Sequence, residues 1–304
     1  MKHLISRPAS FGLLALMLQL GLSGLGPTPA RAMISVAELH ARHAKANARR
    51  AARKGSRKFS VVLDPGHGGI DHGTSYNGAP PVAEKDLTLI LARAVARQLR
   101  SRGIEVTLTR DGDYEMPLAA RTALANKLGA DVFVSIHLNS MAGTRTELAE
   151  GVETYILNNE TDSTSHRLAK LENEVIGSGS PQPQDVALIL KDMQLDANLA
   201  ESKRLACLIQ SHVVAATPHL REKGIEVTSN RGVRQAMFFV LLGADMPSAL
   251  VEAGFLSNPH DRAWLLTLRG ESSFAQAVAR AINLFRLQRN TPQARLTLSR
   301  CKVH

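Results

Sequence analysis

Three side chains in this sequence have the chemistry to bind a catalytic metal ion. His67 lies in a glycine-rich turn, Glu84 stands just before a helical pattern, and His137 follows an apolar run. Two imidazoles and one carboxylate, with a fourth position left for water, form a recognised catalytic zinc set. Such an ion lowers the pKa of its bound water to near neutrality, which makes that water a nucleophile. These three residues are therefore candidate ligands of a catalytic Zn²⁺.

Glu252 is the candidate catalytic acid and base. It ends an apolar run that begins at Ser248 and is followed by the segment Ala253-Gly254-Phe255. A carboxylate at the end of a strand could take a proton from the attacking water and pass it to a leaving amine.

Each of these residues also has an ordinary structural interpretation. A histidine in a glycine-rich turn is commonly a hydrogen-bonded turn residue, and the helix macrodipole favours a carboxylate such as Glu84 at a helix start. Glu252 would serve equally well as an acceptor for nearby backbone N–H groups. The spacing alone leaves both interpretations open, because the candidate ligands are scattered and no His-Glu-x-x-His helix is present.

Short apolar runs alternate with helical patterns, and these elements must position the candidate residues. The runs predict strands at residues 59–63, 104–108, 131–136, 151–157, 237–242 and 248–252. The helical spacing predicts helices at residues 87–99, 117–129, 196–217 and 271–289, the first with Asp86 as its N-cap. The alternation indicates an α/β fold, a single domain with a mostly parallel twisted sheet flanked by helices. Functional residues collect beyond the carboxyl ends of such strands.

An insertion over residues 160–195 contains two helical patterns separated by a Gly/Ser/Pro break at 177–181. In the first pattern, Glu172 is predicted to share one face with Leu168, Leu171, Val175 and Ile176. The second pattern carries a similar apolar stripe, formed by Val186, Ile189, Leu190 and Met193. A carboxylate on an apolar face is costly unless it finds a cation or hydrogen bonds. The alternative is a partly buried glutamate on an ordinary packing helix.

The N-terminal residues predict export. Residues 1–32 have a basic start, an apolar run and the sequence Ala30-Arg31-Ala32, which is typical of a signal peptide cleaved after about Ala32. Residues 33–58 form a basic flexible arm, 59–290 the catalytic domain and 291–304 a basic tail. We therefore expect a protein secreted to the periplasm by the general route.

The basic charge is confined to the N-terminal region. Of the net charge of +10, residues 1–32 carry +3 and residues 33–58 carry +7, so residues 59–304 are close to neutral. A basic arm without a basic folded face argues against nucleic acid as a partner. The arm could contact an anionic membrane or wall surface, and the alternative is a solvated tether. Aromatic residues make up 4% of the chain, which also disfavours a base-stacking surface.

Cysteine usage leaves one question open. The chain has two cysteines, Cys207 and Cys301, which allow one disulfide in an oxidising compartment but do not form a disulfide framework. The fold must therefore rest on a hydrophobic core, and 44% hydrophobic residues suffice for one.

Four ordered motifs together resemble the zinc-dependent N-acetylmuramoyl-L-alanine amidases of the Amidase_3 family. They are Leu63-Asp64-Pro65-Gly66-His67-Gly68-Gly69, Glu84-Lys85-Asp86, Ser135-Ile136-His137-Leu138-Asn139-Ser140 and Val251-Glu252-Ala253-Gly254-Phe255-Leu256-Ser257-Asn258. The similarity covers about residues 59–288. It implies that His67, Glu84 and His137 bind zinc and that Glu252 is the catalytic glutamate. It also implies a single α/β domain.

The resemblance implies a peptidoglycan hydrolase that cleaves the amide between N-acetylmuramic acid and L-alanine. In division-associated members, a helix blocks the active site and a glutamate caps the zinc. The segment Ala169-Lys170-Leu171-Glu172-Asn173 resembles that helix, so we hypothesise that Glu172 is an inhibitory fourth ligand. Activation would then require a partner of the LytM type, and we expect a monomer. A zinc peptidase acting within the stem peptide and a non-catalytic wall-binding or regulatory protein are the alternatives.

Overall fold

The computed structural model describes residues 57–141, 149–158, 162–174, 197–217, 221–222, 225–226, 230–289, 291, 301 and 303. The predicted signal peptide, almost all of the basic arm and the second apolar stripe of the insertion lie outside these residues. Within them, no helix is both long and apolar enough to cross a membrane.

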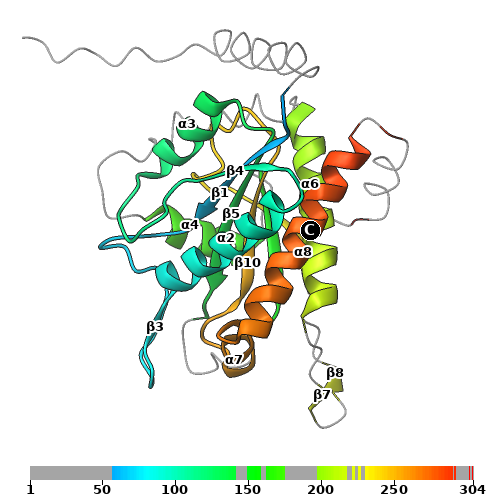
Figure 1. The fold of residues 1–304 in the computed structure, drawn as a ribbon. Helices are drawn as coiled ribbons and strands as arrows, with labels where there is room; N and C mark the ends of the chain where they lie inside the picture. The colour runs from blue at the N-terminus through cyan, green and yellow to red at the C-terminus, as the bar shows by residue number, and fades with distance from the viewer. Residues whose placement is uncertain are drawn as a thin grey trace, which may run out of the picture. The chain divides into compact units, whose positions relative to one another are not determined.

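A six-stranded sheet forms the centre of the domain, in the order β4-β1-β5-β10-β6-β9 (Figure 1). The strands are β1 (Ser60–Pro65), β4 (Glu105–Leu108), β5 (Val132–Asn139), β6 (Val152–Leu157), β9 (Asn230–Ala236) and β10 (Ser248–Phe255). Neighbouring strands are parallel except at one junction, where β10 and β6 pair antiparallel. The predicted mostly parallel sheet is confirmed. Two short strand pairs, β2–β3 and β7–β8, lie outside it and span Ser75–Tyr76, Val82–Ala83, Arg221–Glu222 and Ile225–Glu226.

Helices cover both faces of this sheet. The first face carries α2 (Glu84–Arg100), α6 (Ala197–Ala216) and α8 (Leu268–Gln288), and their apolar side chains join one large core cluster. The second face carries α3 (Leu118–Leu128) and α4 (Ser163–Asn173), whose buried residues join a second, smaller cluster. A short helix, α7 (Pro259–Leu265), follows β10 and is capped by the Asn258 side chain. The sequence patterns did not indicate α7 or the β2–β3 hairpin.

Alternation along the strands determines which side chains meet on the second face. In β5, Val132 and Val134 belong to the first core cluster, whereas Phe133 belongs to the second. Because side chains on a strand point to opposite faces in turn, Ser135 and His137 lie on the same side as Phe133. The same rule places Asp64 on β1, Glu153 on β6 and Glu252 on β10 on that face. Asp64, Ser135, His137, Glu153 and Glu252 therefore share the face that α3 and α4 cover.

The prediction of a strand at residues 237–242 is wrong. These residues form a buried turn, and Phe238, Val240, Leu241 and Leu242 fill the second core cluster. The strand lies just before them, as β9, and its polar residues gave no apolar signal. A short apolar run reports burial, and burial alone does not distinguish a strand from a packed turn.

The first long helix begins earlier than predicted. Glu84 is the first residue of α2, the N-cap is Ala83, and Asp86 lies in the first turn instead of capping it. The predicted face of the inserted helix also needs correction, because Leu171 is exposed. The buried face of α4 is formed by Ser165, Leu168, Ala169 and Glu172, spaced by three and four residues. Val175 and Ile176 lie outside the described residues.

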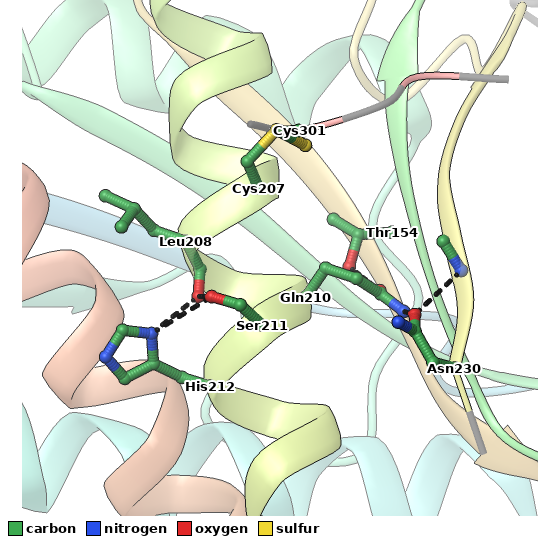
Figure 2. Close-up of a disulfide and its surroundings, with 9 residues drawn as sticks. Thr154, Cys207, Leu208, Gln210, Ser211, His212, Asn230 and Cys301 are labelled. Atoms are coloured by element: carbon green, nitrogen blue, oxygen red, sulfur yellow. Dashed lines mark hydrogen bonds between the residues drawn. A yellow bond between two sulfur atoms is a disulfide. The ribbon is translucent and has the colours of Figure 1, made fainter. Parts of the chain in front are cut away.

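A disulfide joins Cys207 of α6 to Cys301 near the C-terminus (Figure 2). Val303 pairs with Val233 of β9 in a parallel bridge, so Val303 lies beside the edge strand of the sheet. One turn along α6, the side chain of Gln210 accepts a hydrogen bond from Thr154 and donates one to Asn230, which links the helix to β6 and β9. The structure thus settles the open question of cysteine pairing.

Candidate metal centre and active site

Four side chains from four separate elements converge on one point. They are His67 after β1, Glu84 at the start of α2, His137 in β5 and Glu172 in α4, and one ligand atom from each lies within 4.8 Å of the others. His67 Nε2 is 3.1 Å from Glu84 Oε1 and 3.3 Å from Glu172 Oε2. His137 Nδ1 is 3.2 Å and 3.0 Å from the same two oxygens.

These distances suit a metal ion at the centre of the cluster. Bonds of about 2.0–2.1 Å from a tetrahedral ion place neighbouring ligand atoms roughly 3.3 Å apart. The ring nitrogens and Glu172 Oε2 are buried but have no hydrogen-bond partner among the described residues. Buried polar atoms without partners are rare in native structures, and a shared cation would satisfy all three. The donor set therefore fits a metal ion on geometry and on chemistry.

The charges around the cluster also favour a cation. Burial lowers the pKa of His137, but the carboxylates of Glu172 and Glu84 outweigh it and raise that pKa to about 10. Burial likewise lowers the pKa of His67, and Glu84 and Glu172 raise it to well above its usual value. Burial raises the pKa of Glu84 and Glu172, whereas the two imidazoles lower it to below the usual range. Two buried carboxylates facing two imidazoles stabilise positive charge between them.

Local structure fixes the orientation of the His67 ring. Its Nδ1 is 2.9 Å from Asp71 Oδ2, which turns Nε2 toward the cluster, as carboxylates do for metal-binding histidines. The backbone of His67 is left-handed, with φ of 61°, a conformation that a residue other than glycine rarely adopts. The turn brings its neighbours very close, because a Cβ at Gly66 would lie 2.4 Å from the His137 ring. A Cβ at Gly73 would lie 2.5 Å from the His67 ring.

Glu84 is held by both carboxylate oxygens. Its Oε2 accepts a hydrogen bond from the backbone N–H of Thr74, and its Oε1 accepts one from Leu138 in β5. The first turn of α2 adds the favourable field of a helix N-terminus. Glu84 therefore ties the first helix to the strand that carries His137, and it keeps Oε1 aimed at the ring nitrogens.

Glu252 lies beside this cluster on the neighbouring strand. It pairs in register with His137 of β5, and both of its carboxylate oxygens are buried without a hydrogen-bond partner among the described residues. Burial raises the pKa of Glu252 well above its usual value, and the nearby carboxylates, Glu172 foremost, add to that effect while His137 opposes it. A buried carboxylate with high proton affinity next to a metal centre is suited to acid–base catalysis.

Comparison with known proteins decides the family. The family described as N-acetylmuramoyl-L-alanine amidase, Amidase_3, matches residues 61–284, a span that contains His67, Glu84, His137, Glu172 and Glu252. This chain belongs to that family. It is an N-acetylmuramoyl-L-alanine amidase, a hydrolase of cell-wall peptidoglycan that cleaves the amide between N-acetylmuramic acid and L-alanine.

Several relatives resemble the amidase along most of the described domain. It is 33% identical over 234 residues to N-acetylmuramoyl-L-alanine amidase AmiA of Escherichia coli, covering 76% of each chain. Among solved structures, AmiC2 of Nostoc punctiforme is 29% identical with a TM-score of 0.54, covering 77% of this chain and 99% of that one. An amidase from Clostridium difficile 630 is 27% identical with a TM-score of 0.57, covering 77% and 100%. These comparisons favour an amidase over the two alternative classes.

The amidase also has a buried polar network that the motifs did not predict. Glu153 of β6 accepts hydrogen bonds from Asn139 and Tyr155 and pairs with Arg231 of β9. Glu153 is fully buried and lies opposite Glu252 across the β6–β10 pairing. One signal was available in the sequence, because a glutamate inside an otherwise apolar strand must have partners.

The other histidines in the described part of the chain lie outside the metal cluster. His72, His166, His212 and His260 are absent from the group of converging donors in the described part of the chain. His212 is 2.8 Å through its Nδ1 from the carbonyl oxygen of Leu208, as expected of a helix-surface residue (Figure 2). His219 lies outside the described residues.

Proposed function

We propose that this amidase is a zinc enzyme held inactive by its own α4 helix, and that it acts in wall remodelling and daughter-cell separation. One observation carries the proposed autoinhibition. The carboxylate of Glu172 lies 3.0 Å and 3.3 Å from the two imidazole nitrogens that would bind the ion. A hydrolytic zinc site keeps one position open for water or substrate, whereas a structural site is closed by four protein ligands. With Glu172 present, the set is closed.

His67, Glu84 and His137 would hold the zinc in the active enzyme. When bound, zinc supplies a Lewis acid that polarises the lactyl carbonyl and lowers the pKa of a water molecule. Glu252 accepts a proton from the attacking water as its oxygen adds to the carbonyl carbon. Glu252 then returns that proton to the L-alanine nitrogen as the C–N bond breaks. The products are the glycan lactyl carboxylate and a stem peptide with a free L-alanine amine.

The contacts of α4 support its role as an inhibitory helix. At its start, Asp162 caps the helix and pairs with Arg234 of β9, with 2.7 Å between Oδ2 and Nη1. At its end, Asn173 donates to the carbonyl of Met237 and accepts from the N–H of Phe239, at 2.7 Å and 2.8 Å. Glu172 is the residue before this second attachment. The helix is therefore anchored on both sides of its metal-facing carboxylate.

The apolar packing of α4 between these anchors is limited, which suits a helix that is displaced from the active site on activation. Only Leu168 and Ala169 of α4 join the second core cluster, and Leu171 is exposed. Burial of these two side chains contributes on the order of 3 kcal/mol. A partner displaces α4 if the free energy of its binding exceeds the sum of this packing, the two anchors and the contact that Glu172 would make with the metal. We propose that a periplasmic activator of the LytM type does so.

Hydrolysis of labelled peptidoglycan by the zinc-loaded protein tests the autoinhibition. The Glu172→Ala variant should release soluble fragments at least ten times faster than the wild type, since each 1.4 kcal/mol of lost inhibition is about tenfold. Glu174→Ala is the matched control, because Glu174 ends the same helix with its side chain 59% exposed. Equal rates for the wild type and Glu172→Ala would contradict autoinhibition and leave a constitutive amidase. Fragments without a free L-alanine amine would instead indicate a stem-peptide peptidase.

The location and the basic arm complete the proposal. Export by a signal at residues 1–32 would place the amidase in the periplasm, where its substrate lies, and residues 33–58 would contact anionic membrane or wall polymers. Fractionation of cells that produce the full chain tests the first part. Binding of the mature protein to anionic vesicles at rising salt tests the second, because such attraction weakens as salt screens the charges.

A further inference from the structure

Two buried arginines donate hydrogen bonds to the backbone of the loop that carries His67. The three successive carbonyls of Pro65, Gly66 and His67 all accept hydrogen bonds from guanidinium groups. Arg110 donates to Pro65 and Gly66, at 3.1 Å and 2.7 Å, and Arg121 donates to Pro65 and His67, at 2.8 Å and 3.0 Å. Because three consecutive peptide groups are held in this way, the loop is restricted to one backbone conformation.

Arg110 also connects this loop to the helix that carries Glu84. The Nη2 that donates to Gly66 also donates to the carbonyl of Lys85, at 2.7 Å, and to Thr88 Oγ1, at 3.1 Å. Lys85 directly follows Glu84. One guanidinium therefore spans the backbone beside two of the proposed ligands, and its planar fork fixes their separation.

Arg121 holds the other side of the loop. Its Nη1 lies 2.9 Å from Asp64 Oδ1 at the end of β1, while its Nη2 reaches the His67 carbonyl. Asp64 is itself held by the hydroxyl groups of Thr109 and Ser135. This arrangement stabilises the left-handed backbone of His67, a conformation that residues other than glycine rarely adopt.

Burying two guanidinium groups is expensive, and their partners point to a role beyond the core. Arg110 is fully buried and Arg121 is 3% exposed, yet Asp64 is the one carboxylate that bonds either of them in the described structure. Apolar side chains of similar volume commonly stabilise a core as well as a buried ion pair does. What apolar side chains cannot do is hold three backbone carbonyls in place.

We infer that Arg110 and Arg121 are positioning residues that fix the His67 loop against the start of α2 and so determine metal affinity. The inference rests on the proposed metal centre. It concerns the apoprotein as much as the loaded enzyme, since the arginines preorganise the ligands before an ion arrives. Replacing either arginine should therefore weaken metal binding out of proportion to the loss of overall stability.

Zinc affinity of the full mature chain, measured by competition with a chromophoric chelator, tests the inference. Residues that orient metal ligands typically change affinity on the order of 10- to 100-fold, and we expect that loss for Arg110→Met. Arg204→Met is the matched control, because Arg204 is also fully buried but contacts Glu201 and Phe285, of α6 and α8. This control should lower the melting temperature and leave zinc affinity within about twofold.

Two further variants keep the test decisive if Arg110→Met folds poorly. Arg110→Lys keeps the charge without the planar fork, and Arg121→Gln removes the second set of loop contacts together with the ion pair to Asp64. Both should weaken zinc binding and alter the visible absorption of the Co²⁺-loaded protein, which reports ligand geometry. Zinc affinity equal to wild type in these variants, or an equal loss in Arg204→Met, would overturn the inference. A wild-type protein that binds no metal would instead refute the proposed metal centre.

Discussion

Glu252 of β10 and Glu153 of β6 lie directly opposite each other on antiparallel strands, and both side chains are fully buried. Their surroundings differ. Glu153 is paired with Arg231 and hydrogen-bonded by Tyr155, whereas the oxygens of Glu252 have no such partner in the described structure. Burial raises the pKa of Glu252, and the facing carboxylate of Glu153 adds to that effect. These two facing glutamates thus suit different roles, one structural and one in proton transfer.

Replacing Glu252 by glutamine should remove proton transfer without removing the metal. General acid–base catalysis contributes about 10²- to 10⁴-fold, so the hydrolysis rate should fall by that factor. The measurement belongs in the Glu172→Ala background, where the rate does not depend on release of α4. Zinc affinity should stay within a few-fold of its parent. A Glu252→Gln variant with the parental rate would assign the base to another residue.

Replacing Glu153 by alanine should destabilise the fold. The change leaves the Tyr155 hydroxyl and the Asn139 amide buried without their acceptor, and we expect a cost of about 2–4 kcal/mol in the free energy of unfolding. Urea denaturation measures it. Glu105→Ala, at an exposed position of β4, is the control and should change the free energy by less than about 0.5 kcal/mol. Similar values for both variants would show that the Glu153 network contributes little.

Replacing Asn173 by alanine should loosen α4 without touching Glu172. The variant loses two hydrogen bonds to the backbone of Met237 and Phe239, worth about 1 kcal/mol each, so basal hydrolysis should rise roughly 5- to 30-fold. Lys170→Ala on the exposed side of α4 is the control and should leave the rate unchanged. An Asn173→Ala rate at the wild-type level would mean that this anchor does not hold the helix closed.

Removing the metal should lower thermal stability. At free zinc about 100 times its dissociation constant, binding contributes about 2.7 kcal/mol, which corresponds to a melting temperature higher by about 5–10 °C. Chelation should abolish that difference in the wild type and in His166→Gln, a control outside the cluster. The Glu84→Gln variant should show little response to zinc or chelator. A full zinc response in Glu84→Gln would exclude Glu84 as a ligand.

Reduction of the disulfide should weaken the fold but not the metal site. Cys207 and Cys301 close a loop of 94 residues, and a native disulfide of this kind stabilises a protein by about 2–4 kcal/mol. Chemical denaturation with and without reductant measures the loss. The Cys207→Ala/Cys301→Ala variant should match the reduced protein and be insensitive to reductant. An unchanged denaturation midpoint after both thiols are shown to be free would contradict a stabilising role.

The sequence alone determined the features that depend on local chemistry. Glycines around His67, the polar residues that end the apolar runs at His137 and Glu252, and the helix start at Glu84 are all local signals, although the strands themselves run on to Asn139 and Phe255. A parallel sheet brings such ends together by its own geometry. The alternation of apolar runs and helical patterns likewise determined the fold class, because each pattern reports which face of an element is buried.

Only the tertiary structure decided which distant residues meet. The approach of Glu172 to the imidazoles depends on how α4 packs, and its exposed Leu171 shows that the apolar pattern misjudged the buried face. The strand β9 was not predicted, because it is defined by its pairing with β6 and not by an apolar composition. The sequence pattern did not single out Arg110, because an arginine is expected to be exposed. In the structure it is buried and donates hydrogen bonds to backbone carbonyls. Contacts between residues far apart in the chain are properties of packing, which local patterns do not encode.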